Sequence, residues 1–107
     1  MTVYYFAVAS QDFLLKEEPV EEILRERMEH YKSMDKVIDF WLIKNPAFLY
    51  KADMAKIQKQ LLKPSAAIIS NNPTFIDWLK LRLGFVRIGK FHASSDNIPH
   101  SLYSNIS

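Results

Sequence analysis

The chain has 107 residues, of which 49% are hydrophobic and 13% aromatic, so it can form one globular core but not two independent ones. Its 14 basic and 12 acidic residues are interspersed and leave a net charge of +2, which gives no broad field to attract a nucleic-acid backbone. The absence of cysteine excludes disulfides, thiolate nucleophiles and cysteine-ligated metal sites.

The first predicted elements are a strand and a long helix. Residues 3–9 are aromatic, β-branched and apolar on both faces, which is typical of a central strand covered from both sides. Ser10 or Asp12 can cap a short turn after this strand, and a helix is predicted over residues 19–33. Arg27 lies inside the apolar stripe of that helix, which suggests that buried or half-buried ion pairing is part of the fold.

Residues 37–43 are predicted to form a second strand, and a carboxylate interrupts it. The two-residue period of a strand places Asp39 on one face with Trp41, and Phe40 on the opposite face. We expect Trp41 to pack in the core, since large aromatic rings usually do.

The middle of the chain predicts helical segments followed by a short strand. A helical turn is expected over residues 47–50, and a helix is expected to begin at Asp53 and to end before Pro64. Residues 66–70 follow as a strand whose small side chains allow a helix to approach closely. The inward-facing residues of the helix are predicted to be Met54, Ile57 and Leu61.

The helix predicted over residues 75–83 carries more apolar surface than one buried face requires. Its core stripe is predicted to consist of Phe75, Ile76, Leu79 and Leu83. Trp78 and Leu81 extend the apolar arc beyond this stripe, and Arg82 lies on the same apolar side. Arg82 therefore either pairs with a buried carboxylate, extends to the rim along Trp78, or belongs to a docking surface for another protein.

The last elements complete one predicted domain over residues 1–92. Gly84 is a plausible helix C-cap, and residues 85–91 alternate as a half-exposed strand does. Residues 93–107 are predicted to form a flexible tail. The element order predicts one four-stranded sheet between helical layers, in which connectivity alone favours parallel neighbours and the last strand favours an antiparallel edge.

The residues predict no catalytic or metal site. None of the three histidines follows a glutamate by three positions, as a di-iron site requires, and two glycines are too few for a phosphate-binding loop. The longest apolar run is far shorter than the ~20 residues of a membrane helix, so we expect a soluble intracellular protein. A domain with few sites and surplus aromatic surface favours a protein-binding module over an enzyme.

Six motifs together indicate a family. They are Glu17-Glu18-Pro19, Leu24-Arg25-Glu26-Arg27, Ile38-Asp39-Phe40-Trp41-Leu42, Pro46-Ala47-Phe48-Leu49, Ala66-Ala67-Ile68 and Trp78-Leu79-Lys80-Leu81-Arg82-Leu83. At these motifs, and from Tyr4 to about Pro99, the chain closely resembles the small cyanobacterial and plastid-encoded open-reading-frame family that assists the aerobic magnesium-protoporphyrin IX monomethyl ester cyclase.

The resemblance implies an α+β fold with a single four-stranded, mainly antiparallel sheet flanked by helices on both faces. It also implies a non-catalytic accessory or assembly factor, without a cofactor, that binds the di-iron cyclase subunit in chlorophyll biosynthesis. Other enzymes of the pathway are possible further partners, and nucleic acid is not expected. The expected location is the cytoplasm or the plastid stroma, with peripheral thylakoid association through the partner.

The expected partner-binding residues are Asp39, Phe40, Trp78, Lys80 and Arg82. The resemblance implies Asp39, Phe40 and Arg82, whereas Trp78 is added as a neighbour of Arg82 and Lys80 as a solvated rim charge. From the residues alone, Asp39 is either the buried partner of Arg27 or Arg82, or half of an exposed recognition pair. The competing function is a carrier that binds a tetrapyrrole intermediate on its aromatic surface.

Overall fold

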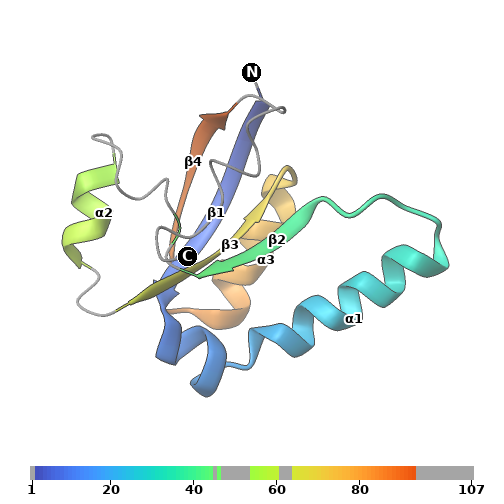
Figure 1. The fold of residues 1–107 in the computed structure, drawn as a ribbon, viewed down its shortest axis with the longest axis horizontal. Helices are drawn as coiled ribbons and strands as arrows, with labels where there is room; N and C mark the ends of the chain where they lie inside the picture. The colour runs from blue at the N-terminus through green and yellow to red at the C-terminus, as the bar shows by residue number, and fades with distance from the viewer. Residues whose placement is uncertain (1, 45, 47–53, 61–63, 94–107) are drawn as a thin grey trace.

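The computed structural model describes residues 2–44, 46, 54–60 and 64–93. These contain one four-stranded sheet in the order β2-β3-β1-β4 (Figure 1). Its strands are β1 (Thr2–Ser10), β2 (Phe40–Lys44), β3 (Ser65–Ser70) and β4 (Arg87–Ala93). The central position predicted for the first strand is confirmed, because β1 lies between β3 and β4 and pairs with both.

All neighbouring strands are antiparallel, which confirms the fold implied by the resemblance and corrects the parallel neighbours that connectivity favoured. Two of the three pairs of successive strands do run in the same direction, since β1 and β2 are both antiparallel to β3, and β3 and β4 are both antiparallel to β1. The third pair, β2 and β3, has α2 between its strands in the chain but is antiparallel. The crossover rule therefore gave the direction correctly for β1 and β2 and for β3 and β4, but not for β2 and β3. For the two pairs that run in the same direction, the predicted adjacency is wrong, because β3 lies between β1 and β2, and β1 lies between β3 and β4.

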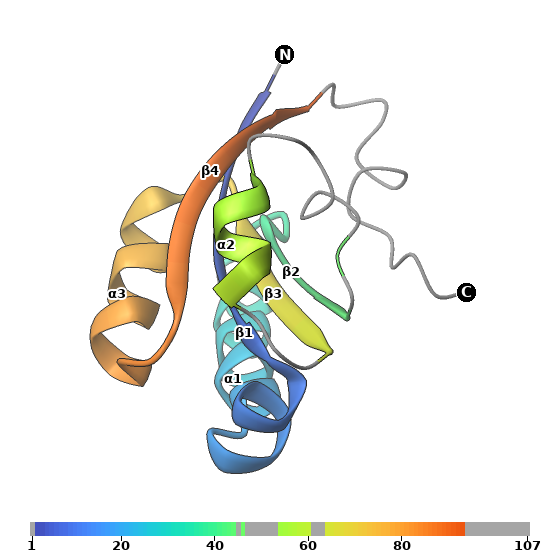
Figure 2. The same cartoon turned by 90° about the vertical axis from the view of Figure 1, so that its left-hand side faces the viewer.

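Helices cover both faces of the sheet, as expected (Figure 2). The helices α1 (Val20–Ser33) and α3 (Pro73–Leu83) pack with Ala7 and Ile68 on one face, whereas α2 (Ala55–Gln60) and Met54 lie against Phe6 on the other. Successive residues of β1 alternate between the two clusters, as the two-residue period requires. The buried residues of both clusters are fully apolar except for Tyr hydroxyl groups, so hydrophobic burial holds the three layers together.

Local signals set the ends of the helices. Ser10 Oγ accepts a hydrogen bond from the backbone N–H of Phe13 (3.1 Å), at the start of a short π-helical segment, η1 (Phe13–Glu17). Asn72 Oδ1 accepts from the N–H of Thr74 (3.0 Å) at the start of α3. Gly84 ends α3 with a φ of 82°, a conformation that glycine adopts without steric cost, so the predicted C-cap is confirmed.

Two strands begin later than predicted. β2 begins at Phe40 rather than at residue 37, and Asp35 precedes it with a positive φ of 55°. β4 begins at Arg87 rather than at residue 85 and extends to Ala93. The predictions for residues 47–50, for Asp53 and Leu61, and for the tail beyond residue 93 lie outside the described residues.

Gly89 in β4 faces Phe6 in β1, and we expect that it cannot carry a side chain without strain. A Cβ at this position would lie 2.6 Å from Cζ of Phe6, whose side chain is fully buried. Gly89→Ala should therefore lower the free energy of unfolding by about 1–3 kcal/mol, as overpacking of a core does. The measurement is urea unfolding, with the same change made in a Phe6→Leu background as control. An equal loss in both backgrounds would contradict a clash with the ring.

Candidate functional site

The exposed face of α3 carries two large apolar side chains and a basic one. Trp78 is 47% exposed and Leu81 85% exposed, and Arg82 is exposed beside them. Spacings of three and four residues place all three on one face of the helix, and we call them the α3 ridge. The four residues predicted for the core stripe of α3 are its buried residues, so the predicted surplus of apolar surface is present.

Arg82 does not make the buried ion pair that was one of its predicted alternatives. Its side chain is exposed, and no hydrogen bond or ion pair joins it to another described residue. A guanidinium in this state keeps all five N–H donors available for an external acceptor. Its flat shape suits a carboxylate, which it can bind through two parallel hydrogen bonds.

Asp39 is half-buried and bonded on the side of the sheet that faces α1. The hydroxyl of Tyr31 donates a hydrogen bond of 2.8 Å to Asp39 Oδ1 and accepts one of 2.9 Å from Nη2 of Arg27. Asp39 therefore connects to Arg27 through a hydroxyl and not to Arg82. The two-residue period of a strand predicted that Asp39 would lie on the opposite face with Trp41. Asp39 precedes the first residue of β2, so this period does not apply to it.

Arg27 is half-buried and rests on aromatic rings. Its Cζ lies 3.8 Å from the ring centroid of Phe75 and 5.6 Å from that of Phe40, within the range of cation–π attraction. Its Nε is buried and has no hydrogen-bond partner. Arg27 therefore contacts a hydroxyl group and aromatic rings in place of the expected ion-pair partner. Within the described part of the chain, no carboxylate contacts it.

Phe40 lies in the core and not on the surface, which differs from the expectation that its ring docks a partner. It is 3% exposed, and its ring packs against the rings of Tyr31 (5.4 Å between centroids) and Phe75 (5.8 Å). The cause is its position on the face of β2 that α1 and α3 cover. Trp41 points to the other face and is half-buried beside Tyr4, 6.2 Å between centroids.

Lys80 differs from the predicted solvated rim charge, because its ammonium group holds the loop after α3. Nζ donates to the backbone oxygens of Gly84 (3.0 Å) and Val86 (2.9 Å). A cation at the C-terminus of a helix also interacts favourably with the helix dipole. Lys80 therefore contributes to the turn between α3 and β4.

Phe85 is an exposed aromatic residue that the sequence did not single out. It is 87% exposed in the same turn, and its ring meets that of Phe13 edge to face, 6.2 Å between centroids. One sign of its exposure is present in the sequence, because Phe85 directly follows the glycine C-cap of α3. The alternation that begins at Phe85 hid this signal, because it indicated the buried side of a strand.

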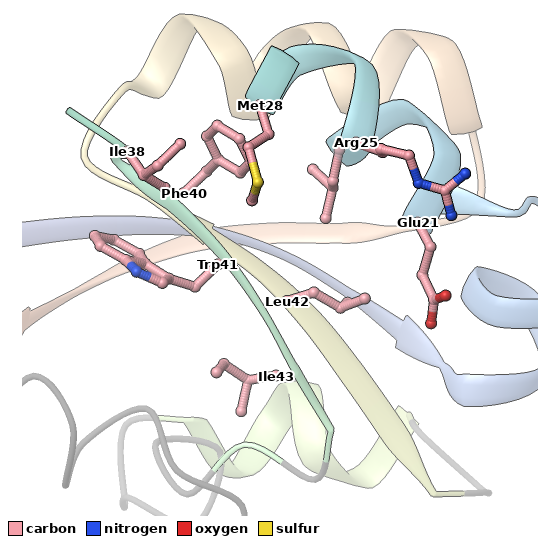
Figure 3. A pocket seen from close by; sticks show the side chains of 9 residues that line it. Glu21, Arg25, Met28, Ile38, Phe40, Trp41, Leu42 and Ile43 are labelled. Atoms are coloured by element: carbon pink, nitrogen blue, oxygen red, sulfur yellow. The ribbon is translucent and has the colours of Figure 1, made fainter. Parts of the chain in front are cut away.

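A second surface feature is a largely apolar groove of about 520 Å³ between α1 and β2, which we call the α1–β2 groove (Figure 3). Met28 lies beside Phe40 in this groove, and Arg25 and Glu21 lie further along α1. The complete set of lining residues is Glu21, Leu24, Arg25, Met28, Ile38, Phe40, Trp41, Leu42 and Ile43.

Two kinds of feature are absent from the part of the chain that the structure describes. No group of three or more histidine, aspartate or glutamate side chains is placed there to hold a metal ion. No helix among those residues is both long and apolar enough to cross a membrane.

Comparisons with known proteins agree on one family. The family model described as "Ycf54 protein" matches residues 2–93. "Uncharacterized protein ycf54" of Pyropia yezoensis is 57% identical over 91 residues, which cover 85% of this chain and 82% of that protein. "Protein YCF54, chloroplastic" of Arabidopsis thaliana is 39% identical over 105 residues, which cover 97% of this chain and 48% of that one. The solved structure of the Ycf54 protein from Synechocystis sp. PCC6803 is 47% identical, has a TM-score of 0.90 and covers 98% of both chains.

Proposed function

The chain belongs to the Ycf54 family, and from this premise we propose that it is a non-catalytic accessory factor that binds and supports the di-iron magnesium-protoporphyrin IX monomethyl ester cyclase of chlorophyll biosynthesis. The motifs that carry its resemblance to the cyclase-assisting family support this role. The observation that carries it furthest is the α3 ridge, in which an exposed tryptophan and leucine lie beside an arginine without a partner in the described chain. Tryptophan and arginine are the residues most enriched at the energetic centres of protein interfaces.

The proposed contact is burial of Trp78 and Leu81 against the cyclase subunit, with Arg82 bound to a carboxylate of the partner. Removing apolar surface from water supplies most of the affinity of such an interface. The arginine adds orientation, because a bidentate pair tolerates little rotation. Phe40 is buried and Asp39 is half-buried, so both would act on the ridge indirectly, and Lys80 would act by holding the turn that follows it.

The proposed location is the plastid stroma or the cytoplasm of a cyanobacterium, with contact to the thylakoid only through the partner. The relative described as chloroplastic supports a place in the plastid lineage. Other enzymes of chlorophyll biosynthesis are proposed as further members of the complex. Nucleic acid is not a proposed partner, because the basic residues are interspersed with acidic ones.

Affinity capture tests the proposal. The tagged chain should recover the cyclase subunit from a cyanobacterial or algal lysate, and the tagged cyclase subunit should recover this chain. Leu81→Asp should abolish both, because it places an unpaired charge in the buried centre of the proposed contact. Val37→Asp is the matched control, since Val37 is equally exposed but lies outside α3. Failure of wild-type capture in both directions, or equal loss with Val37→Asp, would contradict the proposal.

A tetrapyrrole carrier is the second candidate, and the α1–β2 groove favours it. The groove has a volume in the range of small-molecule sites and a largely apolar lining, with Arg25 available for a propionate group. Absorption titration with the magnesium porphyrin substrate distinguishes the two functions. A saturable spectral shift at stoichiometric protein, lost in Met28→Asp, would support the carrier. An unchanged spectrum would leave the accessory role as the proposal.

A further inference from the structure

Arg27 is the inward-turned arginine of α1, and hydrogen bonds alone do not fix its position. Arg25 on the same helix is exposed, whereas Arg27 is half-buried. Its guanidinium donates a hydrogen bond from Nη2 to the hydroxyl of Tyr31, and its Nε remains buried without a partner. A cation that gives up water in this way must be held by other contacts.

The hydroxyl of Tyr31 connects Arg27 to the carboxylate of Asp39. Tyr31 accepts from Arg27 and donates to Asp39, so the hydroxyl joins a positive to a negative group within two short hydrogen bonds. Each bond polarises the other, since the charges at the two ends favour the same orientation of the hydroxyl. Asp39 thereby holds Arg27 in place without touching it.

The ring of Phe75 connects Arg27 to Trp78 of the α3 ridge. The guanidinium lies 3.8 Å from the ring centroid of Phe75, a geometry of close stacking. The ring of Phe75 in turn stacks on that of Trp78, with 6.1 Å between centroids and 18° between planes. A continuous series of contacts therefore leads from Asp39, through Arg27, to the exposed tryptophan of the ridge.

From these contacts we infer that Arg27 is a positioning residue for the partner-binding surface: anchored by Asp39 through Tyr31, its planar guanidinium fixes the ring of Phe75 and so the orientation of Trp78. The effect on partner binding rests on the proposed function, whereas the effect on Trp78 does not. Asp39 thus has an indirect role, at the end of the series that lies farthest from Trp78.

Fluorescence of Trp78 tests whether Arg27 orients its side chain. Trp41→Phe leaves Trp78 as the single tryptophan, and Arg27→Lys is then introduced because it keeps the charge but loses the planar group. The emission of Trp78 should shift to longer wavelength, and its indole ring should become more accessible to acrylamide. Tyr31→Phe, which interrupts the connection to Asp39, should shift it in the same direction. Arg87→Lys, at an exposed site on β4, is the matched control and should leave it unchanged.

Affinity for the purified cyclase subunit tests whether this orientation of Trp78 matters for partner binding. It is measured on variants whose circular dichroism matches that of the wild type. Arg27→Lys and Tyr31→Phe should each weaken binding by about tenfold. An unchanged Trp78 spectrum in a folded Arg27→Lys or Tyr31→Phe protein would overturn the inference. A changed spectrum with unchanged affinity would leave Arg27 as the group that orients Trp78 and would overturn the role of Trp78 in docking.

Discussion

Phe40→Ala is expected to lower the free energy of unfolding by about 3–5 kcal/mol, as removal of a buried phenylalanine does. The ring is 3% exposed and is packed between Tyr31 and Phe75 under both covering helices. Its loss would leave a cavity beneath Arg27, whose guanidinium also rests near this ring. For a domain of this size such a loss is a large part of the total stability.

Urea unfolding followed by circular dichroism measures this effect. Phe85→Ala is the matched control, because the same side chain is removed from an 87% exposed position, and its effect should stay within about 0.5 kcal/mol. Loss of cyclase capture by Phe40→Ala would then reflect the unfolded fraction. A Phe40→Ala protein that is as stable as the wild type but fails to bind would show instead that the ring leaves the core to meet the partner.

Arg82→Ala is expected to weaken binding to the cyclase subunit by about 2 kcal/mol or more, which corresponds to roughly a 30-fold rise in Kd. The reason is the loss of the charged donor group beside the two apolar residues of the α3 ridge. The fold should be unaffected, because Arg82 has no hydrogen bond or ion pair to any residue that the structure describes.

The experiment is a titration of the cyclase subunit with each variant, together with thermal unfolding of the free chain. Arg87→Ala, a second exposed arginine without an assigned role, serves as control. Arg82→Lys should recover only part of the affinity, since an ammonium group cannot form the bidentate pair. If Arg82→Ala unfolds the chain, Arg82 is a structural residue and its docking role is refuted.

The sequence predicted those features that depend on neighbouring residues. The helical period of α3 correctly separated Phe75 and Leu79, which are buried, from Trp78 and Leu81, which are exposed. Gly84 marked the end of this helix for a local reason, the positive φ that its position requires. The two apolar faces of β1 likewise indicated that other strands and two helical layers would enclose it.

Features that depend on long-range partners could not be read in the same way. A carboxylate near a strand gives no sign that Tyr31, on a preceding helix, will bind it, so Asp39 was placed on the wrong face. Lys80 had the spacing of a surface charge, and only the path of the loop brought two carbonyl groups to its ammonium. The predicted strand adjacency was wrong for the same reason, because a helical connection gives no sign of the strand that lies between β1 and β2 or between β3 and β4.

The order of the strands in the sheet also constrains when the fold can form. β1 ends at Ser10, but the strands that flank it begin only at Ser65 and Arg87. During synthesis, the aromatic residues of β1 therefore leave the ribosome long before either hydrogen-bonding neighbour exists. Since non-local pairing requires closure of long loops before it stabilises the chain, folding is a late event that awaits β4. A chain stalled before Arg87 would present one unpaired edge of β1 to chaperones or to other nascent chains.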